Sequence, residues 1–122
     1  MLRLKEEVNR AARYGQKLGL LILRPAGPLN ETDLWHLNTV LREGVRASDV
    51  AGHLDRKRVA VILPNGGVRR VAQAKRRLQL LMGPVRYDIG CATMPGDATD
   101  HEGLIAVAMA DCESRGVAQQ AA

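Results

Sequence analysis

Apolar and polar segments alternate along the chain in a way that predicts four buried strands. Unbroken apolar runs, typical of strands covered on both faces, occur at residues 18–23 and 59–63. Extended stretches are also expected at 50–54 and at 85–93, where apolar and polar residues alternate loosely. The charged segment 55–58 lies between two of these strands and predicts a hairpin tip. The pattern therefore indicates a sheet that contains at least one hairpin.

Helical spacing of apolar residues predicts four helices around these strands. The apolar positions are Leu4, Val8, Ala11 and Ala12 in the first helix; Leu34, Leu37, Leu41 and Val45 in the second; Val68, Val71, Ala72, Leu78 and Leu81 in the third; and Leu104, Val107 and Ala108 in the fourth. Asn30 or Thr32 can cap the second helix and Asp100 the fourth, because their side-chain oxygens accept from free backbone N–H groups. Segments rich in proline and glycine separate the elements, at 24–28, 64–67, 83–84 and 95–97.

The predicted order of elements is helix, strand, helix, strand, strand, helix, strand, helix. Without its first and last helices, this order is the split βαβ pattern of ferredoxin-like folds. The sequence therefore predicts an α+β fold, with an antiparallel-centred sheet and helices packed on it. Residues 1–116 are expected to form a single domain, and residues 117–122 a disordered tail. Because this fold hosts many functions, function must be argued from particular residues.

The composition is that of a globular domain with an excess of positive charge. The chain of 122 residues is 46% hydrophobic and carries a formal net charge of +5, which favours an anionic partner. Its cysteines, Cys91 and Cys112, are too few for a zinc site or a disulfide framework, and we interpret them as small apolar residues in a reducing compartment. No signal peptide is visible and no apolar run has the length of a membrane span, so we expect a cytoplasmic protein.

Several segments carry motifs whose order and spacing are informative. They are Arg10–Gly15, similar to "RA-RYG"; Leu41–Glu43 with Arg46–Val50, similar to "LR…R-x-S-D-V"; Val59–Pro64, similar to "FAVLLP"; Asp88–Pro95, similar to "SIGVATYP"; and Ala110-Asp111, similar to an "AD" in a final helix. In order and spacing, these segments resemble those of the GGDEF family of bacterial diguanylate cyclase domains. The resemblance spans nearly the whole chain. It implies the GGDEF-type version of the ferredoxin-like fold.

The resemblance also implies that the catalytic machinery is lost. Asp55-Arg56-Lys57-Arg58-Val59 stands where the family has its Gly-Gly-Asp/Glu-Glu-Phe signature. The family's magnesium-binding carboxylates correspond to Lys57 and Arg24, and a further aspartate corresponds to Ala26. Ammonium and guanidinium groups cannot ligate Mg²⁺, which requires hard oxygen ligands and on which nucleotidyl transfer depends. We therefore expect no catalytic residue, no metal site, no cofactor and no diguanylate cyclase activity.

The resemblance further implies a site for cyclic di-GMP, the family's product. In the family, an RxxD motif lies five residues before the signature, and a later helix adds another arginine. Residues 46–49, Arg-Ala-Ser-Asp, form such a motif at that spacing, and Arg77 is the matching later arginine. Arginine can bond guanine O6 and N7 or pair with phosphate, and aspartate can accept from guanine N1 and N2. Arg46, Asp49 and Arg77 are therefore expected to converge on one exposed patch that binds cyclic di-GMP.

Two functional hypotheses follow. The first is a non-catalytic cyclic di-GMP receptor or regulatory module. The alternative is a ligand-free protein-interaction or dimerisation domain of a bacterial signalling protein, in which Asp49 only starts a strand and Arg46 only interacts with the end of its helix. The expected protein partners are other signalling domains or a second copy of the chain. Nucleic-acid binding is not expected, because the strands lack the aromatic pairs that RNA-recognition motifs use.

Other noticeable side chains are given structural roles. The basic residues at 56–58 are expected to form a solvated hairpin tip. A basic exposed helix face is expected from Arg69, Arg70, Lys75 and Arg76. Trp35 is expected in the core or in an interface. No role is assigned to the histidines, which lack metal-like spacing: His36, His53 and His101.

Overall fold

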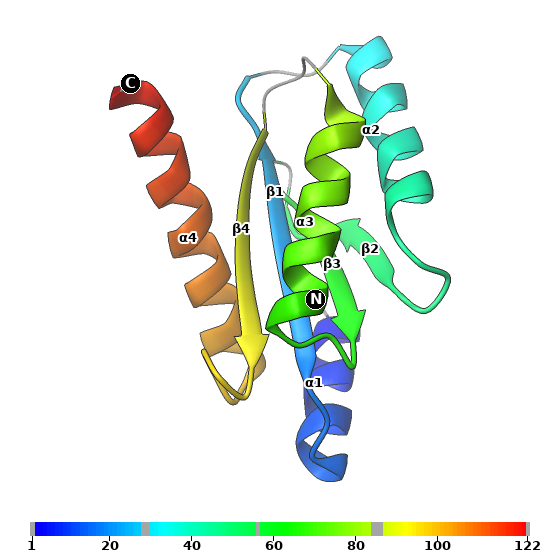
Figure 1. Cartoon of the computed structure of the whole chain (residues 1–122), viewed down its shortest axis with the longest axis vertical. Helices are drawn as coiled ribbons and strands as arrows, with labels where there is room; N and C mark the ends of the chain where they lie inside the picture. The colour runs from blue at the N-terminus through cyan, green and yellow to red at the C-terminus, as the bar shows by residue number, and fades with distance from the viewer. Residues whose placement is uncertain (1, 28–29, 56, 84–86, 122) are drawn as a thin grey trace.

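The helices and strands occur in the order that the sequence predicts. The computed structural model describes residues 2–27, 30–55, 57–83 and 87–121. The elements are α1 (Leu2–Tyr14), β1 (Leu18–Pro25), α2 (Glu31–Gly44), β2 (Val50–His53), β3 (Val59–Pro64), α3 (Val68–Met82), β4 (Tyr87–Met94) and α4 (His101–Ala121). Figure 1 shows the strands at the centre of the molecule with helices around them. Some expectations fall on residues outside the described ranges, namely Pro28, Arg56, Pro84, Val85 and Ala122.

The strands form a sheet in the order β2-β3-β1-β4, and its described pairings are all antiparallel. β1 lies at the centre, where Leu21 is paired with Val61 of β3 and with Cys91 of β4. α2 follows β1 and α3 follows β3, so these helices form the connections of the split βαβ pattern. The prediction of an α+β, ferredoxin-like fold is therefore confirmed.

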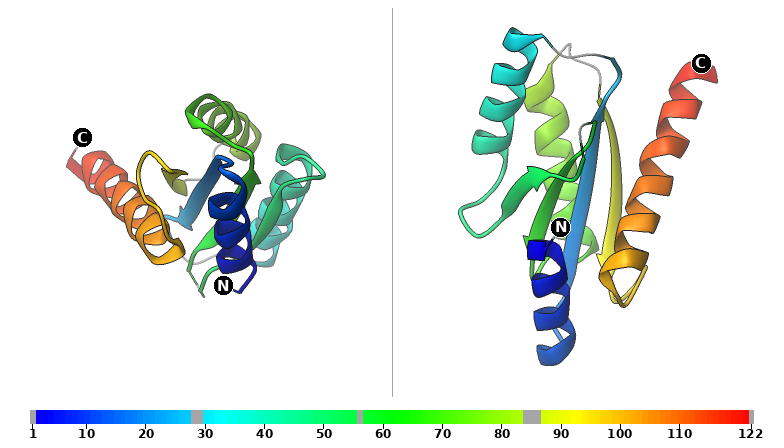
Figure 2. Two further views of the ribbon diagram at one scale, coloured as in Figure 1. Left: turned by 90° about the horizontal axis from the view of Figure 1, so that it is seen from below. Right: turned by 180° about the vertical axis from the view of Figure 1, so that it is seen from behind.

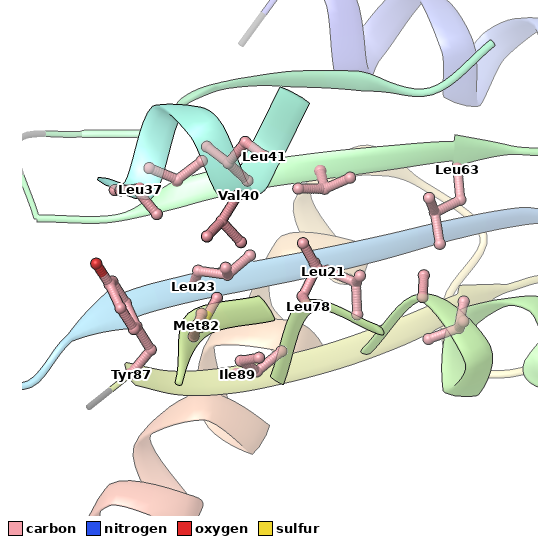
Figure 3. Packing of buried hydrophobic residues seen from close by; sticks show 14 residues of the cluster. Leu21, Leu23, Leu37, Val40, Leu41, Leu63, Leu78, Met82, Tyr87 and Ile89 are labelled. Atoms are coloured by element: carbon pink, nitrogen blue, oxygen red, sulfur yellow. The ribbon is translucent and has the colours of Figure 1, made fainter. Parts of the chain in front are cut away.

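Helices cover both faces of the sheet. Successive side chains of a strand point to opposite faces, so alternate residues of β1 pack against different helices. On one face, Leu21 and Leu23 of β1 pack with residues of α2 and α3, and Figure 3 shows this core around Leu78. On the other face, Leu20 and Ile22 pack with residues of α1 and α4. The two views of Figure 2 show these helices on either side of the strands. The unbroken apolar run of β1 thus reflects burial on both faces.

Glycine lets two helices approach the sheet closely. A Cβ at Gly19 of β1 would collide with the Val71 side chain of α3. A Cβ at Gly90 of β4 would collide with backbone atoms of Ala108 and Cys112 on α4. Backbone atoms of a packed helix cannot move aside as the end of a side chain can. Gly90 therefore determines how near α4 lies to β4.

Polar side chains cap α2 and α4 as the sequence predicts. Asn30 accepts from the Asp33 backbone N–H at 2.8 Å, and Asp33 accepts from the Asn30 N–H at 3.4 Å, which completes a capping box. Thr32, the other candidate cap, lies inside the helix. Asp100 accepts from the Gly103 N–H at 2.6 Å and so caps α4.

Two expectations about individual residues are corrected. β1 continues to Pro25 instead of ending at residue 23, and there it pairs with β4 alone, Pro25 lying opposite Tyr87. A proline has no backbone N–H to donate. It is tolerated here because this end of β1 has a described neighbouring strand on one side only. Trp35 does not lie in the core, since 69% of the residue is exposed. Its role in an interface stays a prediction.

α4 continues as a helix to Ala121, past residue 116, where the sequence analysis ends the domain. Because side chains of this helix are described as far as Ser114, the domain boundary and the disordered tail at 117–122 stay predictions. Among the described helices, none combines the length and the apolar character that crossing a membrane requires.

Candidate functional site

A groove of about 530 Å³ lies between the C-terminal end of α2 and the surface of α3. The described residues that line it include four arginines: Arg46, Arg70, Arg76 and Arg77. Among these lining residues, Glu43 is the one with an acidic side chain. The lining therefore carries a net positive charge. The volume lies within the range of small-molecule sites, which is about 300–1,000 Å³.

The close approach of α2 to α3 builds this arginine groove. α2 ends at Gly44, where a Cβ would lie 2.6 Å from the Leu78 side chain of α3. Val45 is extended and leads the chain out of the helix. In the loop that follows, the Asp49 N–H donates to the Arg46 carbonyl at 3.0 Å, and the Arg46 N–H donates to Asp49 Oδ2 at 2.8 Å. These two hydrogen bonds close residues 46–49 into a turn.

Arg46 and Arg77, two of the three predicted ligand residues, line the same groove. Arg77 is exposed and precedes the buried Leu78, so it flanks the buried stripe of α3 as predicted. Its Nη2 donates to the Glu43 carbonyl at 3.2 Å, one of the carbonyls that the last turn of a helix leaves without an intrahelical donor. Arg46 is exposed as well. A molecule in the groove can therefore reach both guanidinium groups.

Asp49, the third predicted ligand residue, is not an exposed carboxylate, and that expectation is wrong. Its side chain is 2% exposed, and its Oδ2 lies 2.6 Å from Nη2 of Arg70. Arg70, which was expected on an exposed helix face, has a side chain that is 19% exposed. The Asp49 carboxylate is thus paired with α3, and Arg70, not Asp49, is among the residues that line the groove.

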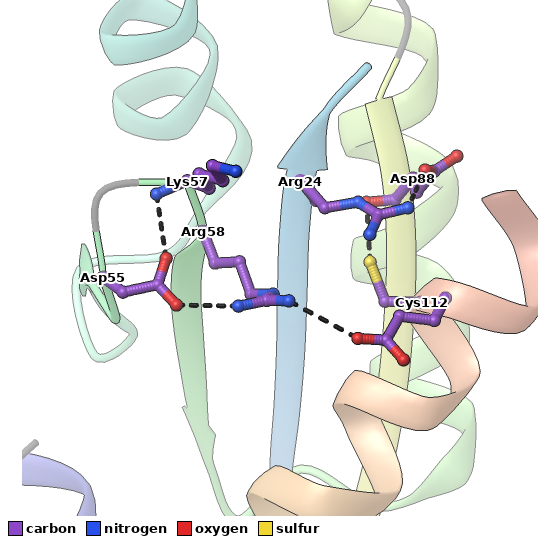
Figure 4. A network of polar contacts seen from close by, with 7 residues as sticks. Arg24, Asp55, Lys57, Arg58, Asp88 and Cys112 are labelled. Carbon is purple, nitrogen blue, oxygen red and sulfur yellow. Dashed lines mark hydrogen bonds and ion pairs between the residues drawn. The ribbon is translucent and has the colours of Figure 1, made fainter. Parts of the chain in front are cut away.

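Arg24, in the strand end where the resemblance places a metal carboxylate, is held by an aspartate of the neighbouring strand (Figure 4). Its Nη2 lies 3.0 Å from Oδ2 of Asp88, which is opposite it in the sheet and whose side chain is 6% exposed. The hydrogen bond that Arg24 donates to Asp88 raises the pKa of Arg24 above its ordinary value, so the guanidinium stays charged. Cys112 donates its thiol to the Asp88 carbonyl at 3.4 Å, and burial raises the pKa of that thiol.

Arg58 ties the hairpin between β2 and β3 to α4. It lies 2.8 Å from Asp55 in the hairpin and 3.4 Å from Glu113 in α4 (Figure 4). The Asp55 carboxylate also accepts from the Lys57 backbone N–H at 2.8 Å. This hydrogen bond and, to a smaller extent, the contact with Arg58 lower the pKa of Asp55. The expected solvated tip is confirmed for Lys57, which is exposed, and is wrong for Arg58, whose side chain is 20% exposed.

No protein-family model matches the chain, and no curated protein matches its sequence. Solved structures match its fold. The DGC protein from Thermotoga maritima is 21% identical and superposes with a TM-score of 0.79, covering 90% of this chain and 89% of that one. The GGDEF domain of DgcB from Caulobacter crescentus, in complex with c-di-GMP, is 15% identical with a TM-score of 0.80, covering 93% and 81%. This chain has the fold of a GGDEF domain. The diguanylate cyclase SiaD from Pseudomonas aeruginosa, in complex with its activator SiaC, is 17% identical with a TM-score of 0.83, covering 95% of this chain and 52% of that one.

The residues at the positions where the resemblance places magnesium ligands do not fit those ions. The resemblance assigns the metal carboxylates to the positions of Arg24 and Lys57, and neither side chain has an oxygen to offer. Asp55 and Asp88, the carboxylates beside them, are each paired with an arginine. Among the residues that the structure describes, no cluster of three or more His, Cys, Asp or Glu side chains is arranged to hold a metal ion.

Three side chains that organise the arginine groove and the surroundings of Arg24 and Arg58 are not among the predicted site residues: Arg70, Asp88 and Glu113. Asp88 had a local signal, because an aspartate within a buried strand requires a partner. Arg70 and Glu113 had none, since they meet Asp49 and Arg58 through tertiary contacts across 21 and 55 positions of sequence.

Proposed function

We propose that this domain is a non-catalytic receptor module of the GGDEF type, which binds cyclic di-GMP in the arginine groove. The observation that carries the proposal is that Arg46 and Arg77 line one groove. They belong to different elements and match the RxxD arginine and the later helix arginine of the family resemblance. Both side chains are exposed beside the same groove, so one anionic ligand can contact both guanidinium groups.

The charges in the groove suit the chemistry of a cyclic dinucleotide that carries two phosphates and two guanines. Each guanidinium offers a planar fork of N–H donors, which fits either a phosphate or the O6 and N7 atoms of guanine. Arg76 adds a further exposed cation beside Arg46 and Arg77. Each charge-assisted hydrogen bond contributes about 1.5–3 kcal/mol net, so a few such contacts support useful affinity.

The absence of catalysis is proposed from the residues at the catalytic edge. Arg24 and Lys57 place positive charges where nucleotidyl transfer requires metal-binding carboxylates. Arg24 is also fixed there, because its partner Asp88 is almost fully buried. Opening that ion pair would leave a buried carboxylate without a partner, which is costly.

Two of the solved structures support the proposal that the ligand is cyclic di-GMP and that the domain acts together with other proteins. The DgcB GGDEF domain was solved with c-di-GMP, and the SiaD cyclase was solved with an activator protein. By analogy, we propose that this domain works in the bacterial cytoplasm, and that ligand binding in its groove changes its interaction with another signalling domain or with a second copy of the chain.

Thermal unfolding with and without cyclic di-GMP tests the receptor function. A ligand selective for the folded state stabilises it by about 2.7 kcal/mol at one hundred times its Kd, so the Tm should rise by several degrees. The rise should shrink in Arg46→Gln and Arg77→Gln. It should persist in Arg69→Gln, which removes an exposed arginine of α3 outside the groove. An unchanged Tm at high micromolar ligand would reject the receptor function.

Incubation with GTP and Mg²⁺ or Mn²⁺ tests the proposed lack of catalysis. No cyclic di-GMP should form above a blank without protein. Metal-dependent product that disappears on substitution near Lys57 would contradict this part of the proposal.

A protein-interaction domain without a nucleotide ligand is the second candidate function. The observation that favours it is a pair of exposed apolar residues at the start of α2, where Trp35 is 69% and Leu34 is 43% exposed. Adjacent exposed apolar side chains of this kind occur at protein–protein interfaces, which are enriched in tryptophan. The thermal experiment separates the candidates, because an interaction domain gives no shift with cyclic di-GMP.

A further inference from the structure

The pairing of Asp49 with Arg70 changes how the arginine groove can recognise a ligand. A carboxylate exposed in the groove would accept from guanine N1 and N2, as the sequence analysis expects. Here the Asp49 side chain is 2% exposed, and its Oδ2 receives the Arg46 N–H at 2.8 Å and Arg70 Nη2 at 2.6 Å. The surface that a ligand meets at this point is the guanidinium of Arg70, which lines the groove.

We infer that Arg70 is a specificity-determining residue of the groove: it withholds Asp49 from the bases and presents a phosphate-binding guanidinium in its place. This inference rests on the proposed function of the groove. It assigns base recognition to arginine forks at guanine O6 and N7, and phosphate recognition to arginines including Arg70. The N2 amino group of guanine then has no partner in Asp49.

The charge and reach of Arg70 support this role. Arg70 lies one helical turn before Ala74 and Gln73, which also line the groove, so its side chain borders the same space as Arg77. Its side chain is 19% exposed and lines the groove, while its Nη2 lies 2.6 Å from Asp49 Oδ2. A planar guanidinium can hold a carboxylate with one edge and a phosphate with another, because it has five N–H donors.

Cyclic di-IMP is the probe that isolates the N2 contact, because inosine keeps the O6, N7 and N1–H of guanine and lacks its 2-amino group. Calorimetry should give wild-type affinities for cyclic di-GMP and cyclic di-IMP within about threefold of each other. Arg70→Gln uncovers the Asp49 carboxylate, and it should then prefer cyclic di-GMP by about tenfold or more while its affinity for cyclic di-IMP falls. Arg70→Lys, which keeps a cation beside Asp49, should retain the wild-type ratio, and so should the matched control Arg69→Gln.

Glu43 must be separated from Asp49, because it is the other carboxylate beside the groove. A wild-type preference for cyclic di-GMP of about tenfold that persists in Glu43→Gln would overturn the inference and leave the receptor function standing. Equal affinities in both wild type and Arg70→Gln would also overturn it, since Arg70 would then not be what masks Asp49. A wild-type protein that binds neither dinucleotide would reject the receptor function itself, and the inference with it.

Discussion

Replacing Asp49 by alanine is expected to destabilise the domain, in contrast to the loss of an exposed ligand carboxylate. The substitution removes the acceptor of the Arg46 N–H at 2.8 Å and the partner of Arg70 at 2.6 Å. It thereby removes one of the two hydrogen bonds that close the turn at residues 46–49 and leaves a largely buried guanidinium without its carboxylate.

The size of the loss follows from burial. Breaking a fully buried ion pair costs about 3–5 kcal/mol, and a hydrogen bond to a charged group is worth about 1.5–3 kcal/mol. The Asp49 side chain is 2% exposed, but Arg70 is 19% exposed and can turn toward water, which reduces the penalty. We therefore expect a loss of about 2–3 kcal/mol in the free energy of unfolding for Asp49→Ala. Asp49→Asn keeps an acceptor for the Arg46 N–H and should lose less.

Urea unfolding followed by circular dichroism measures these changes, and a double-mutant cycle with Arg70→Ala isolates the pair. The coupling energy should reach about 1 kcal/mol or more, as expected for residues in contact. Glu6→Ala, which removes an exposed carboxylate of α1, is the control and should stay within about 0.5 kcal/mol of wild type. If Asp49→Ala is as harmless as Glu6→Ala, or if its effect is the same with and without Arg70, the Asp49–Arg70 pair does not stabilise the domain.

Three other outcomes are expected. Gly90→Ala should lower the free energy of unfolding by about 3 kcal/mol or more in urea titrations, because its Cβ would collide with the α4 backbone. Gly52→Ala, with open space around its Cβ, should be nearly neutral. Equal effects of the two substitutions would contradict the close packing of α4. Because the folded-state pKa of Asp55 is depressed, its contribution to stability should be present above about pH 4 and be lost as the pH falls through the folded-state pKa. Urea titrations between about pH 5 and 3 should show a weaker acid dependence in Asp55→Asn than in wild type, and identical profiles would speak against this contribution. Lys57→Glu alone should make no cyclic di-GMP from GTP and Mg²⁺ in a chromatographic assay, because Arg24 remains; product from this single variant would show that Arg24 does not block metal binding.

The sequence predicts the fold well because the fold depends on local patterns. The apolar run at residues 18–23 is long enough to identify the central strand, and the polar caps Asn30 and Asp100 mark two helix starts. The placement of Arg77 beside Leu78 follows from helical periodicity in the same way. Such features need no knowledge of which helix lies next to which.

The charge pairs could not be predicted in this way, because they depend on how separate elements approach one another. Arg70 has the local pattern of an exposed helix residue, and only the position of the loop at 46–49 directs it onto Asp49. Arg58 similarly has the pattern of a hairpin tip and reaches Glu113 because α4 lies close to the sheet. Trp35 fits the helical pattern of its segment but lies on the uncovered side of α2.

Calorimetric titration of the wild-type domain with cyclic di-GMP decides whether the arginine groove is a ligand site. We expect saturable binding at micromolar ligand or below, weakened in Arg77→Gln by about tenfold, which corresponds to the loss of about 1.4 kcal/mol of binding free energy. Arg69→Gln should bind as wild type does. A titration without heat of binding up to high micromolar cyclic di-GMP, or equal affinities of wild type and Arg77→Gln, would contradict the assignment of the arginine groove as the ligand site.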